Sequence, residues 1–210
     1  LANAPHVPVH LGSMGESLRA LLATQDPQSG EAWMSNDPYN GGSHLPDVTV
    51  MMPVIVNGQR LAMVAARGHH IDVGGSHPGS MPPAASHIDE EGLRWHNHRL
   101  SNAHEMTFPN LDDCRQPEDV RADLQAQVKA CQRGVERVQQ LIKRIGVEAF
   151  VAQQQHLLDQ AERASRRWQS RNLGQHQVCL PLEEGGKLSL ELNVGRERVS
   201  LRLNAPASQS

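Results

Sequence analysis

His44 and Asp47, three positions apart, and a later group of His69, His70 and Asp72 are side chains of the kinds that bind metal ions and transfer protons. Two histidines with one carboxylate suit Mn²⁺, Fe²⁺ or Zn²⁺ at a site with open positions. Both groups lie among glycines and prolines, which favour short irregular backbone beside more regular elements. The pattern predicts a metal or acid–base site, and the alternative is a hydrogen-bonded polar cluster.

The two groups are connected by the sequence pattern of a β-hairpin. Residues 48–56 are almost continuously apolar, and residues 59–67 return as a second apolar strand. Between them, Asn57-Gly58 favours a type I′ turn, because both positions of that turn need a positive φ. The hairpin is therefore expected to bring the two polar groups together at its open end.

An uninterrupted ladder from this turn places Pro46 opposite His69. His44 and His69 then share one face, and Asp47 and His70 share the other, since side chains alternate along a strand. A site that draws on both faces requires the ladder to stop near Pro46, which has no N–H to donate. We therefore expect turn-like backbone there, with His44 and Asp47 pointing the same way.

Length and composition exclude several classes of protein. The 210 residues suit one or two domains with a real core. A formal net charge of −3 and only 3% aromatic residues argue against nucleic-acid binding. No apolar run reaches the length of a membrane span, and no signal segment opens the chain, so we expect a cytoplasmic protein. Three widely spaced cysteines argue against a disulfide framework or a structural zinc site.

The remaining pattern predicts an α+β chain in three regions. Residues 1–112 are expected to form the β and loop region that carries the site, residues 113–172 an antiparallel helical hairpin, and residues 173–210 a short β segment with a disordered tail. Within the first region, an extended start is followed by a short helix from Met14, with Ser13 as its N-cap.

The helical hairpin is predicted from its ends and its apolar periodicity. Pro117 suits the first position of a helix, and Gly146 suits the position after its last turn. Apolar residues recur three or four apart between Val120 and Ile145, as expected for core or subunit interface. Because this stripe is longer than a small β region can cover, we predict that the helical pair supplies an oligomer or partner contact.

Five motifs, in the same order and spacing, carry a resemblance to a known family. They occupy residues 4–14, 36–49, 67–75, 78–83 and 90–92. Through them the chain resembles hydantoinase B, the B subunit or C-terminal half of ATP-dependent 5-oxoprolinases and N-methylhydantoinases. The large subunit of acetone carboxylase is a more distant relative. Members of this family are several hundred residues long, so we expect the chain to be part of something larger.

The resemblance implies an ATP-driven hydrolysis of a cyclic amide that is shared between two parts. A hydantoinase A-type partner uses ATP to phosphorylate the amide oxygen, and the B part opens the hydantoin or 5-oxoproline-type ring. A divalent metal (Mn²⁺, Zn²⁺ or Fe²⁺) takes His44, Asp47 and His69 as ligands. His70 and Asp72 are then the catalytic candidates, placed beside the ligands as their hydrogen-bonding partners.

Two alternatives remain, namely a metal- or partner-binding remnant without turnover and a fragment like the acetone carboxylase large subunit. The chain has no GxxxxGK[ST] motif, so by itself it is not expected to hydrolyse ATP. The pairs Gly41-Gly42 and Gly74-Gly75 suit a phosphate cradle, although tight turns are the preferred interpretation. Cys114 lies in no recognisable motif, which disfavours thiol catalysis.

Overall fold

The computed structural model describes residues 9–79, 82–102, 104–182 and 186–205. It confirms the α+β class and contains two compact units, Leu1–Gly146 and Val147–Ser210, each described here by itself. The predicted extended start up to residue 8 and the predicted disordered tail from residue 206 lie outside the described residues. The division into three domains stays a prediction.

The described helices and strands follow one another along the chain. The α-helices are α1 (Val9–Thr24), α2 (Pro117–Ile145) and α3 (Val147–Arg171), and the 3-10 helices are η1 (Pro38–Asn40) and η2 (Ile88–Glu90). The strands are β1 (Ala32–Ser35), β2 (Asp47–Val56), β3 (Gln59–His69), β4 (His98–Ser101), β5 (Gly174–Pro181), β6 (Lys187–Val194) and β7 (Val199–Asn204). None of the described helices has the length and apolarity needed to cross a lipid bilayer.

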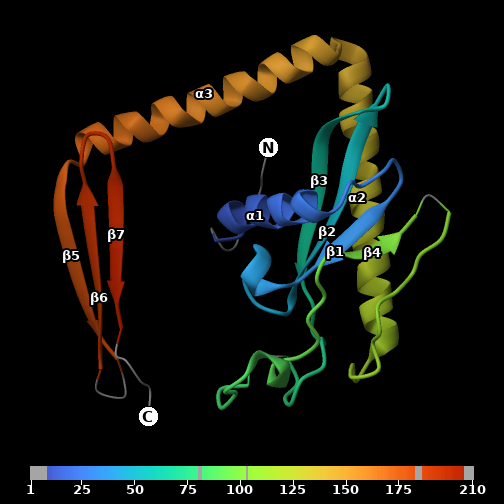
Figure 1. Ribbon diagram of the computed structural model, residues 1–210, viewed down its shortest axis with the longest axis horizontal. Coiled ribbons are helices and arrows are strands. Elements are labelled where there is room, and N and C mark those ends of the chain that lie inside the picture. Colours follow the sequence, from blue (N-terminus) through green and yellow to red (C-terminus); the bar gives the residue numbers. More distant parts are fainter. Residues whose placement is uncertain (1–8, 80–81, 103, 183–185, 206–210) are drawn as a thin grey trace. The chain divides into compact units, whose positions relative to one another are not determined.

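The first unit is built on a four-stranded antiparallel sheet with the order β3-β2-β1-β4. Helices α1 and α2, drawn in blue and yellow in Figure 1, pack on its opposite faces. Side chains alternate along β2, so Val48 and Val50 face α2, whereas Asp47 and Met51 face α1. The polar start of β2 therefore lies under α1.

Helix α2 fills its face of the sheet with the predicted apolar stripe. Val120, Leu124, Val128 and Cys131 are buried in the main core together with residues of β2. Burying one Val or Leu side chain stabilises the fold by about 1.5–3 kcal/mol. The sheet thus covers the first half of the stripe, whereas Ile145 at its end is exposed, so an oligomer or partner contact through the helical pair stays a prediction.

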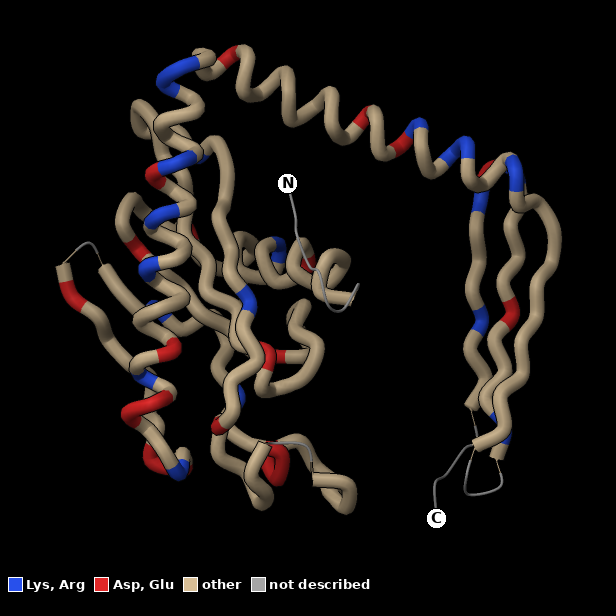
Figure 2. The backbone as a smooth tube through the Cα atoms, turned by 180° about the vertical axis from the view of Figure 1, so that it is seen from behind, with Lys and Arg blue, Asp and Glu red and all other residues tan. Residues whose placement is uncertain are grey.

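Both ends of α2 agree with the sequence prediction. Pro117 occupies the first turn, where two acidic residues follow, and two basic residues occupy the last turn. The acidic first turn and the basic last turn complement the helix dipole, and Figure 2 shows the charged residues along the helix. Gly146 ends α2 at φ 86°, a conformation that favours glycine, and its N–H donates to the carbonyl oxygen of Ile142 at 2.8 Å.

The hairpin of β2 and β3 has the predicted turn but a different register. Asn57 and Gly58 have φ values of 52° and 77°, as a type I′ turn requires. A β-bulge then shifts the register by one residue between Val54 and Ile55. Such a bulge places two residues of one strand opposite one residue of the other, so every later pair differs from the regular ladder.

The bulge decides which residues meet at the open end of the hairpin. Asp47 pairs with His69, so the predicted placement of Pro46 opposite His69 is wrong. Strand β2 begins directly after Pro46, whose carbonyl oxygen accepts a hydrogen bond from the N–H of His70 at 2.8 Å. Asp47 and His69 thus share one face as an opposed pair. The expected turn-like backbone directly precedes them, since the N–H of Asp47 donates to the carbonyl oxygen of His44 at 3.0 Å.

Helix α1 begins earlier than predicted. It starts at Val9, so Ser13 lies inside the helix and is not its N-cap. The predicted extended backbone is therefore wrong for residues 9–12. His10, Ser13, Ser17 and Leu21 are three or four residues apart and so share one helix face. Leu21 is buried against the sheet, which turns this face of α1 toward β2 and β3.

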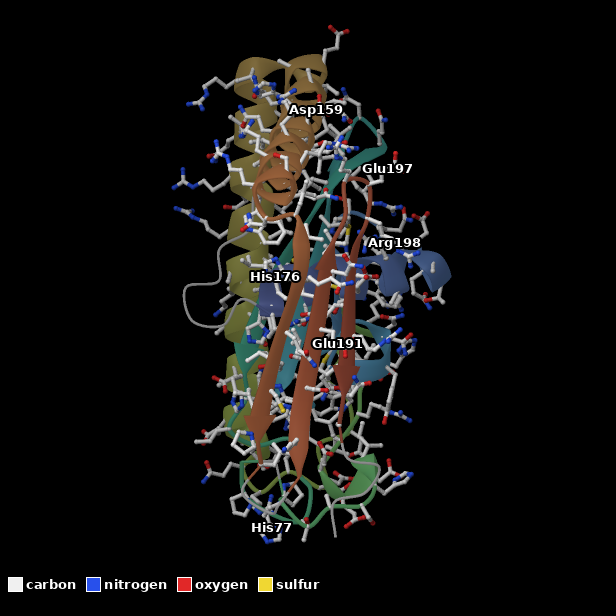
Figure 3. All side chains as sticks on the ribbon, turned by 90° about the vertical axis from the view of Figure 1, so that its left-hand side faces the viewer. His77, Asp159, His176, Glu191, Glu197 and Arg198 are labelled. Atoms are coloured by element: carbon white, nitrogen blue, oxygen red, sulfur yellow. The ribbon has the colours of Figure 1, made fainter. Side chains whose placement is uncertain are left out.

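The second unit contains α3 and a three-stranded antiparallel sheet with the order β5-β6-β7, as predicted for this region. One face of this sheet is polar, and there Glu191, labelled in Figure 3, lies 3.8 Å from Arg202. The other face is apolar and is formed by Val178, Leu180, Leu188, Leu190, Leu192, Val194, Val199, Leu201 and Leu203. On α3, Leu158 and Trp168 are exposed, so a partner contact through this helix stays a prediction.

Candidate metal centre

Asp47 and His69 lie side by side because they form a directly opposed pair of β2 and β3. Opposed residues of an antiparallel pair project from the same face of the sheet. His44 joins them from the preceding loop, where its carbonyl oxygen accepts a hydrogen bond from the N–H of Asp47 at 3.0 Å. The structure therefore brings together the three residues that were expected to bind a metal.

The three side chains are close enough to share one ion. Their potential ligand atoms lie within 4.8 Å of one another. Two ligands at about 2.0–2.2 Å from one ion are at most about 4.4 Å apart, so small side-chain rotations suffice to close the group. Nδ1 of His44 lies 2.8 Å from Oδ2 of Asp47, and the ring centroids of His44 and His69 are 5.2 Å apart.

The exposure of these side chains suits a site with one buried carboxylate and two imidazoles that solvent can reach. The Asp47 side chain is 3% exposed and accepts a hydrogen bond from the hydroxyl of Ser43. The His44 side chain is 30% exposed, and His69 is exposed. A buried carboxylate needs compensating positive charge, which a divalent cation provides. With two imidazoles and one carboxylate, the donor set fits Mn²⁺, Fe²⁺ or Zn²⁺.

Arg67 of β3 places a positive charge next to Asp47 and ties α1 to the sheet. Its Nε donates to Oγ1 of Thr49 at 2.7 Å, its Nη2 donates to Oγ of Ser17 at 2.8 Å, and its Nη1 donates to Oγ of Ser13. Burial lowers the pKa of Arg67, and the negative charge of Asp47 acts in the opposite direction. The guanidinium stays protonated at neutral pH. The sequence pattern does not reveal this role, because the acceptors come from distant segments.

The loop that carries His44 is held by the fully buried side chain of Asn36. Its Nδ2 donates to the carbonyl oxygens of Leu45 at 2.8 Å and Leu93 at 2.9 Å. Its Oδ1 accepts from the N–H of Trp95 at 2.6 Å. One amide thus satisfies three backbone groups from two segments that are far apart in the sequence.

Gly41 allows this loop to approach α1 closely. It has φ 86°, and a Cβ at this position would lie 2.1 Å from the backbone nitrogen of Ser17. The N–H of Gly42 donates to the carbonyl oxygen of Asp37 at 2.9 Å. These contacts support the tight-turn interpretation of the glycine pair over a phosphate cradle.

His70 lies away from the three-residue group, on the α2 side of the sheet. Its Nε2 is 2.9 Å from Oε1 of Gln127 in α2. The amide nitrogen of Gln127 donates to the carbonyl oxygens of Val48 and Ala66, so its oxygen must accept from His70. His70 is therefore protonated on Nε2 and does not make the expected hydrogen bond to a ligating imidazole. Its assignment as a catalytic residue stays a prediction.

Asp72 also makes its hydrogen bonds elsewhere, at the start of α2. Its carboxylate accepts from the N–H of Gly74 at 3.0 Å and from the N–H of Gln116 at 2.8 Å, and Arg115 lies 3.7 Å away. Burial opposes ionisation, but the backbone hydrogen bonds and the charge of Arg115 outweigh it, so the pKa of Asp72 is lowered. The carboxylate fixes the segment after His70 against α2. A catalytic role for Asp72 likewise stays a prediction.

We expect Asp72→Asn to weaken the dependence of the free energy of unfolding on pH in the acid range. Because the folded pKa is lowered, the stabilisation by this carboxylate is fully present above the unfolded pKa of about 3.9 and is lost as the pH falls through the folded value. The difference in free energy of unfolding between wild type and variant should therefore shrink on acidification. Urea unfolding across the acid range measures it, with the exposed Asp112→Asn as the matched control. A difference that does not depend on pH would contradict the assignment.

Cys114 is unsuited to nucleophilic catalysis. Burial, followed by the negative charges of Asp72 and Asp113, raises the pKa of the Cys114 thiol to about 11. The neutral thiol is a poor nucleophile, since the thiolate is the reactive form. The structure thus agrees with the sequence pattern, which disfavours a thiol mechanism.

His10 is a neighbour of the site that the sequence did not distinguish from structural histidines. It lies in the first turn of α1, and its Nδ1 is 3.7 Å from Oδ2 of Asp47. Spacing gives no signal for it, because His10 and Asp47 are brought together only when α1 docks on the sheet.

Comparisons with known proteins agree with the geometry. The sequence profile of hydantoinase B/oxoprolinase matches residues 1–204. The 5-oxoprolinase of Dictyostelium discoideum is 36% identical over 95% of this chain, and 5-oxoprolinase 1 of Arabidopsis thaliana is 38% identical over 79%. The chain spans only 17% and 14% of the lengths of these two relatives.

Two solved structures share the fold. The ATP-dependent caprolactamase from Pseudomonas jessenii superposes with a TM-score of 0.81 at 24% identity, covering 95% of this chain and 37% of that one. Nucleotide-free acetone carboxylase superposes with a TM-score of 0.72 at 18% identity, covering 93% of this chain and 29% of that one. The fold, the profile match and the related 5-oxoprolinases together show that the chain belongs to the hydantoinase B/oxoprolinase family.

Proposed function

We propose that this chain is the catalytic B part of an ATP-dependent cyclic amide hydrolase that opens a hydantoin or 5-oxoproline-type ring. The observation that carries the proposal is the group of His44, Asp47 and His69 at the open end of the hairpin, in a chain of this family. Relatives named 5-oxoprolinase and the fold shared with a caprolactamase support a cyclic amide as the substrate class. A cytoplasmic location, where ATP is supplied, belongs to the same proposal.

The proposed reaction consumes one ATP and two water molecules. A hydantoinase A-type partner transfers the γ-phosphoryl group to the amide oxygen and releases ADP. The first water adds to the ring carbon, and the ring C–N bond breaks as the nitrogen takes up a proton, which leaves an acyl phosphate. The second water converts the acyl phosphate to a carboxylate and inorganic phosphate. Phosphorylation is needed because it turns a poorly reactive amide oxygen into a leaving group.

The residues of this chain prepare the site for the two water additions. Asp47, fixed by Ser43 and His44, is the buried anchor, and the two more exposed histidines complete the donor set. Arg67 keeps a positive charge beside Asp47. A divalent metal held there would polarise the oxygen on the reacting carbon or lower the pKa of the attacking water.

The two residues predicted to be catalytic have a positioning role in this proposal. His70 binds Gln127 of α2, and Asp72 binds the N–H of Gln116 at the start of the same helix. Both contacts fix the backbone that follows His69. The end of β3 that carries His69 is thereby held against a rigid helix, which is the support that a precise site requires.

We expect the chain to hydrolyse a cyclic amide only together with its partner. Full-length chain, a hydantoinase A-type protein and ATP are incubated with 5-oxoproline, hydantoin or caprolactam, and phosphate and ring-opened product are measured. Product should form in proportion to ATP used, and omission of the partner should abolish both, because the chain has no phosphate-binding lysine motif. Steady ATP hydrolysis by the pure chain, abolished by a mutation within it, would contradict this division of labour.

The same experiment separates the two alternatives. Stoichiometric metal binding without product from any ring supports a non-catalytic remnant. ATP consumption that depends on acetone and bicarbonate would support an acetone-carboxylase-like activity. The observation in favour of that activity is the shared fold.

A further inference from the structure

We propose that α3 binds the α3 of a second copy of this chain, with the two helices side by side and antiparallel. The contact surface, which we call the α3 face, has as its apolar members Val147, Phe150, Leu157, Ala161, Ala164 and Trp168. This inference concerns an interaction surface and does not depend on the metal site or on the proposed function. It gives the expected oligomer contact one helix, one partner and one direction.

The first observation is the spacing of the residues on the α3 face. From Val147 to Arg171, steps of three and four residues alternate without a break, and within this series only Gln154 and Arg171 are polar. Alternating steps of three and four define the heptad repeat of a coiled coil, in which the residues concerned form one stripe along the helix. Figure 1 shows α3 as one continuous helix. Its pattern is therefore that of a helix which packs along another helix.

The second observation is that the α3 face is accessible. Every residue of α3 is described, and each is exposed or half-buried. Leu157 is 44% exposed, Trp168 is 50% exposed, and Leu158, which borders the α3 face, is 65% exposed. Helix α2, by contrast, has buried residues along its apolar stripe. A continuous row of accessible apolar side chains indicates a site for a protein partner.

The third observation is that the α3 face is complementary to itself when one helix is reversed. Full overlap of two antiparallel copies of α3 places Phe150 opposite Trp168 and Leu157 opposite Ala161. Aromatic rings then meet near each end of the helix pair, which is a favourable contact. Near the middle, Ala161 and Ala164 line an open hollow on α3, which the Leu157 side chain of the second copy would fill.

The fourth observation is the distribution of charge along α3, which favours the antiparallel direction. Residues 147–159 include Glu148 and Asp159 but no lysine or arginine, whereas residues 160–171 include four arginines and one glutamate. An antiparallel pair places the acidic half of each helix beside the arginine-rich half of the other and also opposes the two helix dipoles. A parallel pair would place the arginine-rich halves side by side, where they repel each other.

The first test measures the mass of full-length wild type, Ala161→Glu and Ala152→Glu by analytical ultracentrifugation over a range of concentrations. Wild type should form a dimer. Ala161→Glu should raise the dissociation constant of the dimer at least about 100-fold, because each copy would bury an unpaired carboxylate. Ala152 is exposed and lies on the opposite side of α3, so Ala152→Glu is the matched control and should leave the dimer unchanged.

The second test reports the direction of the pair through disulfide formation. The chains carry Cys179→Ser, because Cys179 is exposed whereas the other two cysteines are buried. Leu157→Cys and Ala161→Cys chains with different tags are mixed and mildly oxidised. The antiparallel pair predicts disulfides between the two variants, whereas a parallel pair predicts disulfides within each variant.

Three results would overturn the proposal. They are a monomeric wild type, a dimer that Ala161→Glu does not weaken, and disulfides that form within each variant and not between the two. If wild type is a monomer and Ala161→Glu lowers its free energy of unfolding more than Ala152→Glu does, another part of the same polypeptide covers the α3 face. None of these measurements involves metal or ring opening, so their failure is distinct from failure of the proposed function.

Discussion

Asp47→Asn is expected to lower the affinity for a divalent metal by a factor on the order of 100 or more. Loss of residues that merely support a ligand already lowers metal affinity by about 10–100-fold. Asp47 supplies the only carboxylate of the three-residue group, and its side chain is almost fully buried. Asparagine keeps the shape but removes the negative charge that offsets the cation. Isothermal titration with Mn²⁺ or Zn²⁺ measures the loss, and ring opening in the presence of the partner should fall in parallel.

The controls for this variant follow from the neighbours of Asp47. His44→Ala should lose metal while leaving the buried anchor intact, because the His44 side chain is partly exposed. His98→Gln should bind metal as wild type does, because His98 lies on β4, at the opposite edge of the sheet from β3. Asp47→Asn should also lose some stability, since Arg67 then lacks the opposing charge. Metal affinity that is unchanged in a folded Asp47→Asn protein would rule out this carboxylate as a ligand.

Asn36→Ala is expected to destabilise the first unit by at least about 3 kcal/mol. The substitution leaves the carbonyl oxygens of Leu45 and Leu93 and the N–H of Trp95 without their partner in a buried place. Each buried group left unsatisfied costs about 1–3 kcal/mol. Asn36→Asp should be at least as damaging, because a carboxylate cannot donate to the two carbonyl oxygens.

Urea unfolding followed by circular dichroism measures this loss. Asn110→Ala is the matched control, because Asn110 is exposed and accepts a hydrogen bond from the local N–H of Asp112 at 2.7 Å. Surface substitutions of that kind usually change stability by no more than about 0.5 kcal/mol. Equal effects of the two substitutions would show that the loop does not depend on the Asn36 network.

Elements with a local signature were predictable from the sequence. The turn at Asn57-Gly58 requires positive φ at both positions. Pro117 indicates the start of α2, and Gly146 indicates its end. The start of α1 was not predictable, because Ser13 resembles an N-cap although its hydroxyl in fact accepts from Arg67. Strand β4 has only four residues, and its pairing with β1 is set by distant contacts.

The candidate site also has a part that the sequence predicts and a part that it does not. His44, Asp47 and His69 are recognisable because residues of metal-binding types lie close together in motifs on either side of one hairpin. The one-residue bulge that puts Asp47 opposite His69 has no marker in the sequence beyond the nearby Pro53. His10 comes close to Asp47 only through the docking of α1, and the hydrogen bonds of Arg67 to Ser13 and Ser17 depend on the same docking, which no spacing along the chain encodes.

The position of that bulge, close to the turn, separates the tip of the hairpin from its open end. Beyond it, eight consecutive residue pairs run without interruption from Val54–Ala62 to Asp47–His69. The pairing of Asp47 with His69 is therefore set by the long ladder between β2 and β3 and not by the number of residues around Asn57. A residue inserted at the tip is expected to leave the ligands in place, which makes the tip the natural point for an inserted tag or probe.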